Sequence, residues 1–269
     1  MSDAASDSRV AVLHPGAMGA AIARALHDNG HPVAWCSVGR SEATASRAER
    51  FQKFEQLHEL AAWATTVVSV IPPHAAAETA ESVVQAGFQG CYVDANAIAP
   101  QTAATVQGIA ERGGCSYVDG GIIGPPPKKT AGSRLYLSDG GDGTAARRIS
   151  TLFEGSIFEA PVLVGLGPHA ASALKIVFAA WTKGSAAMLL ATARSAEGLG
   201  VMDALRSEWE QSIPEMAARL ERTNGAVGSK AWRYIGEMLE IASAFESAGQ
   251  PGGFHRAAAE VYQQIADEQ

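Results

Sequence analysis

A short apolar run, Val10–Leu13, leads directly into His14-Pro15-Gly16-Ala17-Met18-Gly19 and then into an alanine-rich stretch with helical spacing. A strand, a glycine turn and a helix in this order open a dinucleotide-binding fold, in which N–H groups at the helix start hold the nucleotide pyrophosphate. We expect Gly16 to let the backbone approach the phosphates and Gly19 to let helix and strand pack closely. The first glycine of the G-x-G-x-x-G fingerprint is His14 here, so we expect a turn that is wider or differently bent than usual.

The bulk composition limits the class of protein. The 269 residues suffice for two modest domains with a proper core. A net charge of -7 argues against nucleic acid or a membrane surface as a partner. Cys36, Cys91 and Cys115 show no metal-ligand spacing, which favours reduced thiols in a cytoplasmic protein and predicts no bound metal. Residues 1–8 lack the basic and apolar segments of a signal peptide, and we expect a disordered tail there.

Strand and helix patterns alternate through the first half of the chain. Apolar runs predict strands at Val10–Leu13, Val33–Cys36, Val67–Ile71, Cys91–Val93, Tyr117–Val118 and Leu135–Leu137. Helical patterns separate them, around Ala17–Asn29, Glu42–Arg50, Ala75–Ala86, Thr102–Arg112 and Gly143–Phe153. The alternation predicts an α/β fold: a doubly wound, Rossmann-type parallel sheet covered on both faces, in a dinucleotide-binding domain that spans residues 9–165.

The second part of the chain, residues 166–269, has no convincing strand pattern, and we expect an all-α domain for substrate binding and dimerisation. Predicted helices cover Ala170–Gly198, Asp203–Trp209, Ile213–Arg222, Lys230–Ala248 and Phe254–Ala266. Lys175 and Lys183 interrupt the long first helix, which favours a buried helix over a membrane span. Apolar faces around Trp232, Met238, Leu239, Ile241 and Phe245 predict burial against a second copy, hence a homodimer. The substrate cleft is expected between the domains.

The end of the second predicted strand indicates which dinucleotide binds. It reads Ser37-Val38-Gly39-Arg40-Ser41, without the acidic residue that partners a ribose 2′-hydroxyl. An arginine with neighbouring hydroxyls suits a 2′-phosphate, so NADP is predicted over NAD. The alternative for Arg40 is an ordinary solvated charge at the start of a helix.

Two further strand ends lie at the same expected edge of the sheet. Ile71-Pro72-Pro73 closes the strand that begins at Val67, because proline ends the ladder and leaves a shaped loop where ligands bind. Asn96 follows the next strand and is placed to hydrogen-bond near the nicotinamide or the substrate. An equally good interpretation of Asn96 is a turn or helix-capping residue.

Taken together, these segments resemble the β-hydroxyacid dehydrogenase and 6-phosphogluconate dehydrogenase superfamily. Pro15–Gly19 is similar to its G-x-G-x-M-G start, Asp94–Pro100 to its D-x-S-T-x-x-P segment, and Asp119–Gly124 falls where its substrate-binding D-A-P-V-S-G-G sequence lies. Leu174–Ser185 resembles a branch of phosphogluconate-dehydrogenase-like proteins of undefined substrate, as do Ala231–Tyr234 and Gly253–Arg256. The resemblance runs from about Arg9 to the C-terminus, and it implies the two-domain fold and an NAD(P)-dependent oxidoreductase.

The chain departs from the family pattern in the substrate segments. Ile123 stands where the family has a serine in D-A-P-V-S-G, and Phe178 interrupts the K-x-x-N-N or K-x-x-H-N continuation. The residues Ile122, Ile123 and Gly124 remain the expected substrate segment. The loop that follows offers basic residues, above all Lys128, for a carboxylate or phosphate. That loop can also be read as a solvated basic loop.

Lys175 matches the superfamily's catalytic lysine, which exchanges a proton with the substrate oxygen during hydride transfer. An ammonium in an apolar helix is costly unless it serves a site or reaches solvent. Thr182 and Lys183, further along the same helix, are candidate substrate-binding residues. His169 could be a second acid or a capping residue, and for His255 and Arg233 packing or surface roles are preferred over a place in a partner subunit's cleft.

These residues predict an NADP-dependent oxidoreductase that transfers a hydride to or from a small, anionic hydroxy or oxo acid, with Lys175 as proton donor and acceptor. Imine reductases share the two-domain plan, so an imine reductase is an alternative. A third hypothesis is a binding protein that senses NADP(H) without catalysis, because His14, Ile123 and Phe178 each replace a residue that the family pattern expects.

Overall fold

The computed structural model describes residues 8–127 and 132–268. The chain forms two compact units, which divide after Lys175. The division falls ten residues beyond the boundary expected from the sequence, because the first turn of the long helix packs on the sheet unit through contacts described below.

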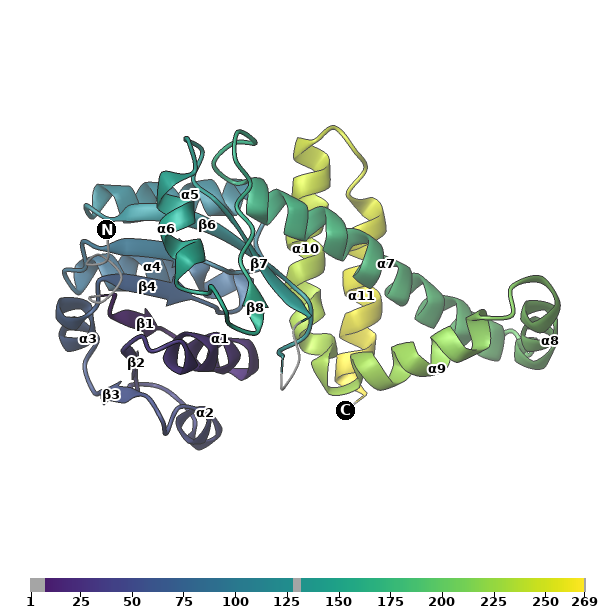
Figure 1. Ribbon diagram of the computed structural model, residues 1–269. Coiled ribbons are helices and arrows are strands. Elements are labelled where there is room, and N and C mark those ends of the chain that lie inside the picture. The colour runs from purple at the N-terminus through teal and green to yellow at the C-terminus, as the bar shows by residue number, and fades with distance from the viewer. Residues whose placement is uncertain (1–7, 128–131, 269) are drawn as a thin grey trace. The chain divides into compact units, whose positions relative to one another are not determined.

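An eight-stranded sheet organises the first unit (Figure 1). Its strands are β1 (Val10–Val12), β2 (Val33–Cys36), β3 (Gln52–Phe54), β4 (Thr66–Ser69), β5 (Cys91–Asp94), β6 (Ser116–Ile123), β7 (Ser133–Ser138) and β8 (Phe158–Glu159). The order across the sheet is β3-β2-β1-β4-β5-β6-β7-β8, and the strands from β3 to β6 run parallel. The chain moves outward from β1 in one direction and then from β4 in the other. The chain therefore changes direction between the neighbouring strands β1 and β4, and this is the topological switch point. Open α/β sheets bind ligands at the carboxyl ends of the strands there.

Helices cover both faces of this sheet, as predicted. They are α1 (Ala17–Asp28), α2 (Glu42–Arg47), α3 (Leu57–Trp63), α4 (Ala76–Gln85), α5 (Pro100–Arg112) and α6 (Thr144–Thr151), with a 3₁₀ turn, η1 (Pro73–Ala75), before α4. Successive strand residues point to opposite faces. In β4, Val67 belongs to the core under α3, α4 and α5, whereas Val68 belongs to the core under α1 and α6. Burial on both sides explains why these strands read as short continuous apolar runs.

Several elements differ from the sequence expectation. The strand β7 is antiparallel to β6, because the nine residues 124–132 between them are too few for the crossover that a parallel pair needs. The strand β6 extends past Val118 through Gly120 and Gly121. A Cβ would be tightly packed at Gly120 and would collide with the carbonyl oxygen of Ala171 at Gly121. The edge strand β3 and the short helix α3 were not predicted, since β3 is exposed and carries no apolar run.

The second unit is all-α. It contains most of α7 (Ala170–Gly198), then α8 (Met202–Ser212), α9 (Met216–Val227), a 3₁₀ turn η2 (Gly228–Lys230), α10 (Ala231–Ser247) and α11 (Gly253–Asp267). Helices α10 and α11 pair closely, and Met238, Ile241 and Tyr262 lie fully buried in the core of this unit.

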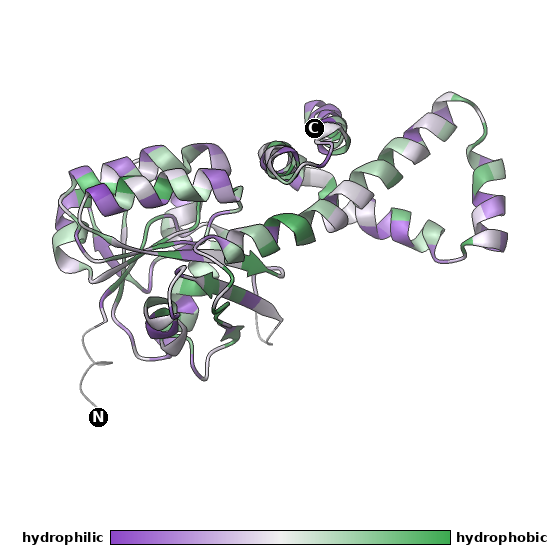
Figure 2. Cartoon of the chain, turned by 90° about the horizontal axis from the view of Figure 1, so that it is seen from above, coloured by the Kyte–Doolittle hydropathy of each residue, from purple (hydrophilic) through white to green (hydrophobic). Residues whose placement is uncertain are grey.

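Among the described residues, α7 is the one helix that is long and apolar enough to cross a membrane. The colouring of Figure 2 shows its apolar stretch. This is weak evidence for a membrane span, because the core helix of a globular domain passes the same test. Ile176, Ala179 and Leu190 of α7 indeed belong to the helical core.

Candidate functional site

The turn between β1 and α1 exposes the N-terminus of a 12-residue helix. Gly16 occupies the N-cap position without a side-chain cap, and the first turn of α1 has no acidic residue. The orphan N–H groups at such a helix start favour an anion. A Cβ on Gly16 would lie no closer than 3.7 Å to the chain, at His14 Cδ2. Packing inside the domain therefore does not require glycine at position 16. A ligand that approaches the backbone at this place would require it.

Gly19 is a packing glycine. A Cβ at this position would collide with the carbonyl oxygen of His14. The close contact between α1 and the end of β1 therefore requires a residue without a side chain. The turn itself is tight: the N–H of Gly16 donates to the carbonyl oxygen of His14 at 2.7 Å. The neighbouring residues Pro15, Ala17 and Met18 complete the turn, with Met18 packed against the core under α1.

The side chain of His14 faces the loop after β2. Its Nδ1 lies 2.9 Å from Nη1 of Arg40, and both residues are half-buried. Burial and the charge of Arg40 lower the pKa of His14, and burial lowers the pKa of Arg40. Nε of Arg40 is buried without a hydrogen-bond partner, and within the described chain Arg40 forms no ion pair. The structure thus brings together His14 and Arg40, which lie 26 residues apart in the sequence.

The rest of the loop after β2 is shaped for this position of Arg40. Gly39 adopts a left-handed conformation with φ +68°, which favours glycine. The Ser41 hydroxyl accepts from the N–H of Thr44 at 3.3 Å and caps α2, while the Ser37 hydroxyl donates to the carbonyl of Phe54. Ser41 is exposed and Ser37 is partly exposed. Both hydroxyls have structural partners and lie within three residues of Arg40 in the chain.

Asn96 lies inside the sheet unit. Its Oδ1 accepts from the N–H of Ile71 at 2.7 Å and its Nδ2 donates to the Ser69 hydroxyl at 3.1 Å. Only 2% of the residue is exposed. This geometry ties the end of β5 to the end of β4 and shapes the half-buried loop Ile71-Pro72-Pro73 that leads into η1. Of the two sequence interpretations of Asn96, the geometry supports the turn residue.

Asp94, at the end of β5, is a buried carboxyl group. It accepts from the N–H of Asn96 at 3.1 Å and from the Tyr117 hydroxyl at 3.3 Å. Burial raises its pKa to about 7, and the charge of Asp119 acts in the same direction.

Asp119 of β6 fastens the start of α7 to the sheet. Its carboxylate accepts from the N–H and the hydroxyl of Ser172, at 2.8 and 2.5 Å, and from the Ser138 hydroxyl at 3.0 Å. The N–H of Ala171 donates to the same Ser138 oxygen at 3.0 Å. A buried carboxylate at the N-terminus of α7 satisfies orphan N–H groups and complements the helix dipole. Sequence reasoning missed Ser138 and Ser172 as partners, because their link to Asp119 spans up to 53 residues.

This anchor places Lys175 above β6. A Cβ on Gly121 would collide with the carbonyl oxygen of Ala171 and lie 3.1 Å from Cβ of Lys175. The side chain of Lys175 therefore begins directly over Gly121, one residue before the expected substrate segment. Within that segment Ile122 and Ile123 are buried and Gly124 has φ +121°. Lys128 lies outside the described residues.

The remaining candidates have partners of their own. In the helical unit, Lys183 forms an ion pair with Glu237, and its Nζ lies 4.4 Å from the Tyr234 ring centroid. The Thr182 hydroxyl is exposed and donates to the carbonyl of Phe178. In the sheet unit, Nε2 of His169 lies 2.7 Å from Oε1 of Gln107. In the parts of the chain that the structure describes, no cluster of His, Cys, Asp and Glu could hold a metal.

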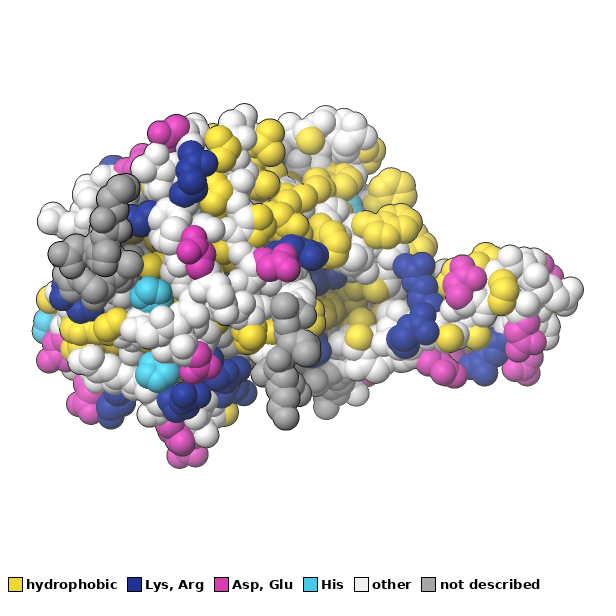
Figure 3. Space-filling view, in the orientation of Figure 1, with side chains coloured by type: hydrophobic (Ala, Val, Ile, Leu, Met, Phe, Trp, Pro, Cys, Tyr) yellow, Lys and Arg dark blue, Asp and Glu magenta, His cyan; other side chains and the backbone are white. Residues whose placement is uncertain are grey.

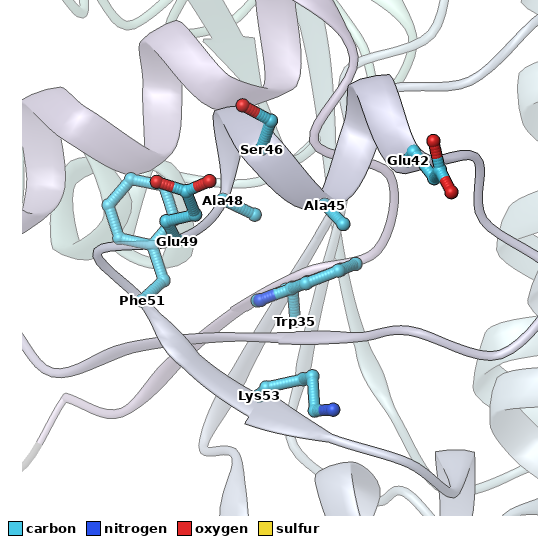
Figure 4. Close-up of a pocket in the computed structure, with 8 residues that line it drawn as sticks. All are labelled: Trp35, Glu42, Ala45, Ser46, Ala48, Glu49, Phe51 and Lys53. Carbon is cyan, nitrogen blue, oxygen red and sulfur yellow. The ribbon is translucent and has the colours of Figure 1, made fainter.

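A hollow of about 360 Å³ lies under α2 (Figure 4). Trp35 of β2 lies across it, with Glu42, Glu49 and Lys53 at its rim. Two carboxylates and one ammonium disfavour an anionic nucleotide. None of the residues of the glycine turn or the loop after β2 lines it. We therefore exclude this hollow as the phosphate site.

A doubly wound parallel sheet with a glycine turn after its first strand defines a nucleotide-binding Rossmann domain. Residues 9–156 match the NAD binding domain of 6-phosphogluconate dehydrogenase, and residues 196–265 match a domain of unknown function, DUF1932. The chain belongs to the family that this NAD binding domain defines. No curated protein matches the chain significantly.

Solved structures of reductases and dehydrogenases share the fold over nearly the whole chain. The Mycobacterium tuberculosis 3-hydroxyisobutyrate dehydrogenase, solved with L-serine, has 20% identity and a TM-score of 0.70, over 97% of this chain and 94% of that one. A reductive aminase from Aspergillus terreus in complex with NADPH has 17% identity and a TM-score of 0.59, over 98% and 95%. The Streptomyces aurantiacus imine reductase has 20% identity and a TM-score of 0.53, over 97% and 95%. The chain therefore has the fold of NAD(P)-dependent oxidoreductases.

The residues of the turn fit a nicotinamide dinucleotide. Gly16 leaves open the space that a Cβ would fill at an uncapped helix start, which suits a pyrophosphate. The buried, unpartnered Nε of Arg40 and the absence of a carboxylate partner for it in the described chain suit an anion beside the ribose.

Proposed function

We propose that this protein is an NADP-dependent oxidoreductase that transfers a hydride to or from a small, anionic hydroxy or oxo acid. One observation supports NADP as the cofactor: Arg40, in the loop after β2, has a buried, unpartnered Nε and no ion pair to a described carboxylate. In NAD-specific Rossmann domains an acidic residue at this place accepts from the ribose 2′-hydroxyl, whereas an arginine accommodates a 2′-phosphate.

Each part of the turn has a role in holding the dinucleotide. The N–H groups at the start of α1 bind the pyrophosphate, and Gly16 permits its approach. Arg40 binds the 2′-phosphate, with Ser37, Gly39 and Ser41 forming its loop. The loop Ile71-Pro72-Pro73 and the Asn96 that shapes it border the nicotinamide side.

Lys175 moves the proton. The nicotinamide accepts or gives the hydride, and the substrate oxygen must lose or gain a proton in the same reaction. Cβ of Lys175 lies over Gly121, the residue before Ile122, Ile123 and Gly124, which we propose as the substrate segment. Lys128, Thr182 and Lys183 are further proposed substrate-binding residues. An ammonium also attracts the carboxylate of a hydroxy or oxo acid.

Two measurements test the proposal. Fluorescence titration should show NADPH binding at least about tenfold more tightly than NADH, because the 2′-phosphate adds charge-assisted hydrogen bonds. Turnover of a panel of 3-hydroxy acids should be abolished in Lys175→Ala while NADPH affinity is kept, and the exposed Lys53→Ala serves as a matched control. Normal turnover by Lys175→Ala would remove this lysine from the mechanism. No affinity for NADPH would refute the function.

An imine reductase is a second candidate. The fold similarity to imine-reducing enzymes supports it, as does Phe178 in place of the polar continuation after the lysine. Turnover of a panel of cyclic imines, compared with 3-hydroxy acids, separates the two. A wild-type protein that binds NADPH tightly and turns over neither panel would instead favour an NADP(H) sensor.

We also propose a cytoplasmic homodimer. The three cysteines are free, which suits a reducing compartment. On α7, Val177, Trp181 and Met188 are exposed and recur at spacings that form one stripe of the helix, and Trp232 and Leu239 of α10 are also exposed. Figure 3 shows hydrophobic side chains gathered over the helical unit. Light scattering at low micromolar concentration tests the dimer, and a clean monomer would refute it.

A further inference from the structure

The contact between His14 and Arg40 fixes the protonation state of the His14 ring. An arginine is always a donor, so Nδ1 of His14 must accept from Nη1 of Arg40 across their 2.9 Å separation. The ring is therefore neutral and carries its proton on Nε2. A protonated ring would instead point an N–H toward a guanidinium N–H.

Two groups that can both be cationic thus lie side by side. Arg40 is the one charge that acts on the His14 ring among the described residues, and the Cys36 thiol in β2 is the titratable group that acts on Arg40. Burial and the Arg40 charge both lower the pKa of His14, so the free protein holds this ring neutral at pH 7. An anion placed against the pair would reverse the electrostatic balance, because it attracts both cations.

We propose that His14, which replaces the first glycine of the fingerprint, is a second ligand of the NADP 2′-phosphate beside Arg40, and that it takes up a proton when the phosphate binds. This inference rests on the proposed function, since it needs NADP as the ligand. On binding, the Arg40 guanidinium turns its donors from the His14 ring to the phosphate oxygens. Nδ1 of His14 gains a proton from solvent and donates to the same phosphate. Both donors in the clamp are then charge-assisted.

His14 in place of the first glycine therefore gives the turn a ligand for the nucleotide in exchange for the glycine that it lacks. The ring reaches from the end of β1 to the end of β2, the two strands that border the adenosine ribose in Rossmann domains. NADH has no 2′-phosphate, so the pair keeps its neutral hydrogen bond when NADH binds. The proton uptake is specific to NADPH.

Isothermal titration calorimetry of the full chain tests this directly. NADPH and NADH are titrated at pH 7.5 in two buffers with different ionisation enthalpies, from which the number of protons bound per nucleotide follows. At this pH the 2′-phosphate is mostly dianionic, because its second pKa is about 6. We expect NADPH binding to take up a fraction of a proton and NADH binding to take up none.

The His14→Gln variant identifies the group that is protonated. Glutamine keeps an acceptor for Arg40 and a donor for the phosphate, but it cannot titrate. We expect the uptake to disappear, the NADPH affinity to fall about tenfold at pH 7, and the NADH affinity to stay as in the wild type. The unchanged NADH affinity shows that the turn still folds. The phosphate's own titration is common to both proteins and cancels in the comparison.

The possible results separate the two proposals. Suppose that NADPH binds more tightly than NADH and that wild type and His14→Gln take up the same number of protons. This result overturns the role of His14 and leaves the NADP-dependent function intact. Equal affinities for NADPH and NADH overturn both the 2′-phosphate clamp and the NADP preference. Loss of proton uptake in His14→Gln, with NADPH still preferred, supports the clamp.

Discussion

Asp119 and Ser172 join β6 to the start of α7: the Asp119 carboxylate accepts from both the N–H and the hydroxyl of Ser172, at 2.8 and 2.5 Å. The start of α7 belongs to the sheet unit, and Lys175 is the residue at which this unit ends. The buried cap that the Asp119 carboxylate forms therefore helps to hold Lys175 over Gly121 of β6.

The first prediction concerns this cap. Asp119→Asn keeps the size of the side chain but has one oxygen for three donors, so at least one buried donor loses its acceptor. We expect the free energy of unfolding to fall by about 2 kcal/mol. Urea denaturation measures it. Ser172→Ala removes only the hydroxyl and should cost about 1 kcal/mol. Equal stability of Asp119→Asn and wild type would show that the cap does not hold α7.

The second prediction is a pH dependence that comes from Asp94. Its pKa is about 7 in the folded protein, whereas an aspartate in the unfolded chain has its ordinary value of 3.8. Between these values the folded state holds a proton that the unfolded state has lost. The free energy of unfolding therefore has a contribution that is complete below pH 3.8 and is lost as the pH rises to about 7.

Asp94→Asn removes this contribution, because asparagine stays neutral at every pH. The stability of the variant relative to the wild type should increase between pH 5 and pH 8, measured by urea denaturation at both values. The exposed Asp28→Asn is a matched control and should show no such change. A difference between Asp94→Asn and wild type that is the same at both pH values would contradict the buried, protonated carboxyl.

The sequence predicted many of the elements that bury apolar side chains, although it missed α3 with the buried Leu60 and β8 with the buried Phe158. The strand Val33–Cys36 and the helix Ala170–Gly198 appear where they were expected. Burial on both faces leaves a short continuous apolar run in a strand, and a long apolar stretch indicates a helix by its length. The edge strand β3 escaped, since two of its three residues are exposed and its pairing with β2 depends on backbone hydrogen bonds. The pattern of apolar residues along the sequence does not indicate an exposed edge strand of this kind.

The site was predictable as a set of strand ends, whereas its internal contacts were not. The parallel sheet brings the ends of β1 and β2 together, which makes His14 and Arg40 neighbours, yet nothing in either segment indicates their hydrogen bond. Asn96 shows the same limit: its amide could serve a ligand or a turn, and only the fold places it against Ile71 and Ser69. Pairings at long sequence separation follow from the three-dimensional arrangement alone.

The third prediction concerns Lys183 and Glu237 of the helical unit. Their side chains are 19% and 15% exposed, so each would be left poorly solvated without the other. Lys183→Met and Glu237→Gln should each lower the free energy of unfolding, and the double variant should lose less than the sum. We expect a coupling of about 1 kcal/mol in the double-mutant cycle, measured by urea denaturation. Additive losses would mean that the two charges do not stabilise each other.

The last prediction separates the two glycines of the turn. In Gly19→Ala the new methyl group meets the carbonyl oxygen of His14, so helix α1 must shift from β1. We expect a loss of stability of about 2 kcal/mol in urea denaturation, within the range of overpacked sites.

In Gly16→Ala the nearest atom is 3.7 Å away and φ is -66°, so the stability should stay within about 0.5 kcal/mol of the wild type. The same methyl group lies where the pyrophosphate approaches, and the affinity for both NADPH and NADH should therefore fall at least about tenfold, measured by fluorescence titration. Gly16→Ala with unchanged affinity for both nucleotides would place the pyrophosphate away from this helix N-terminus.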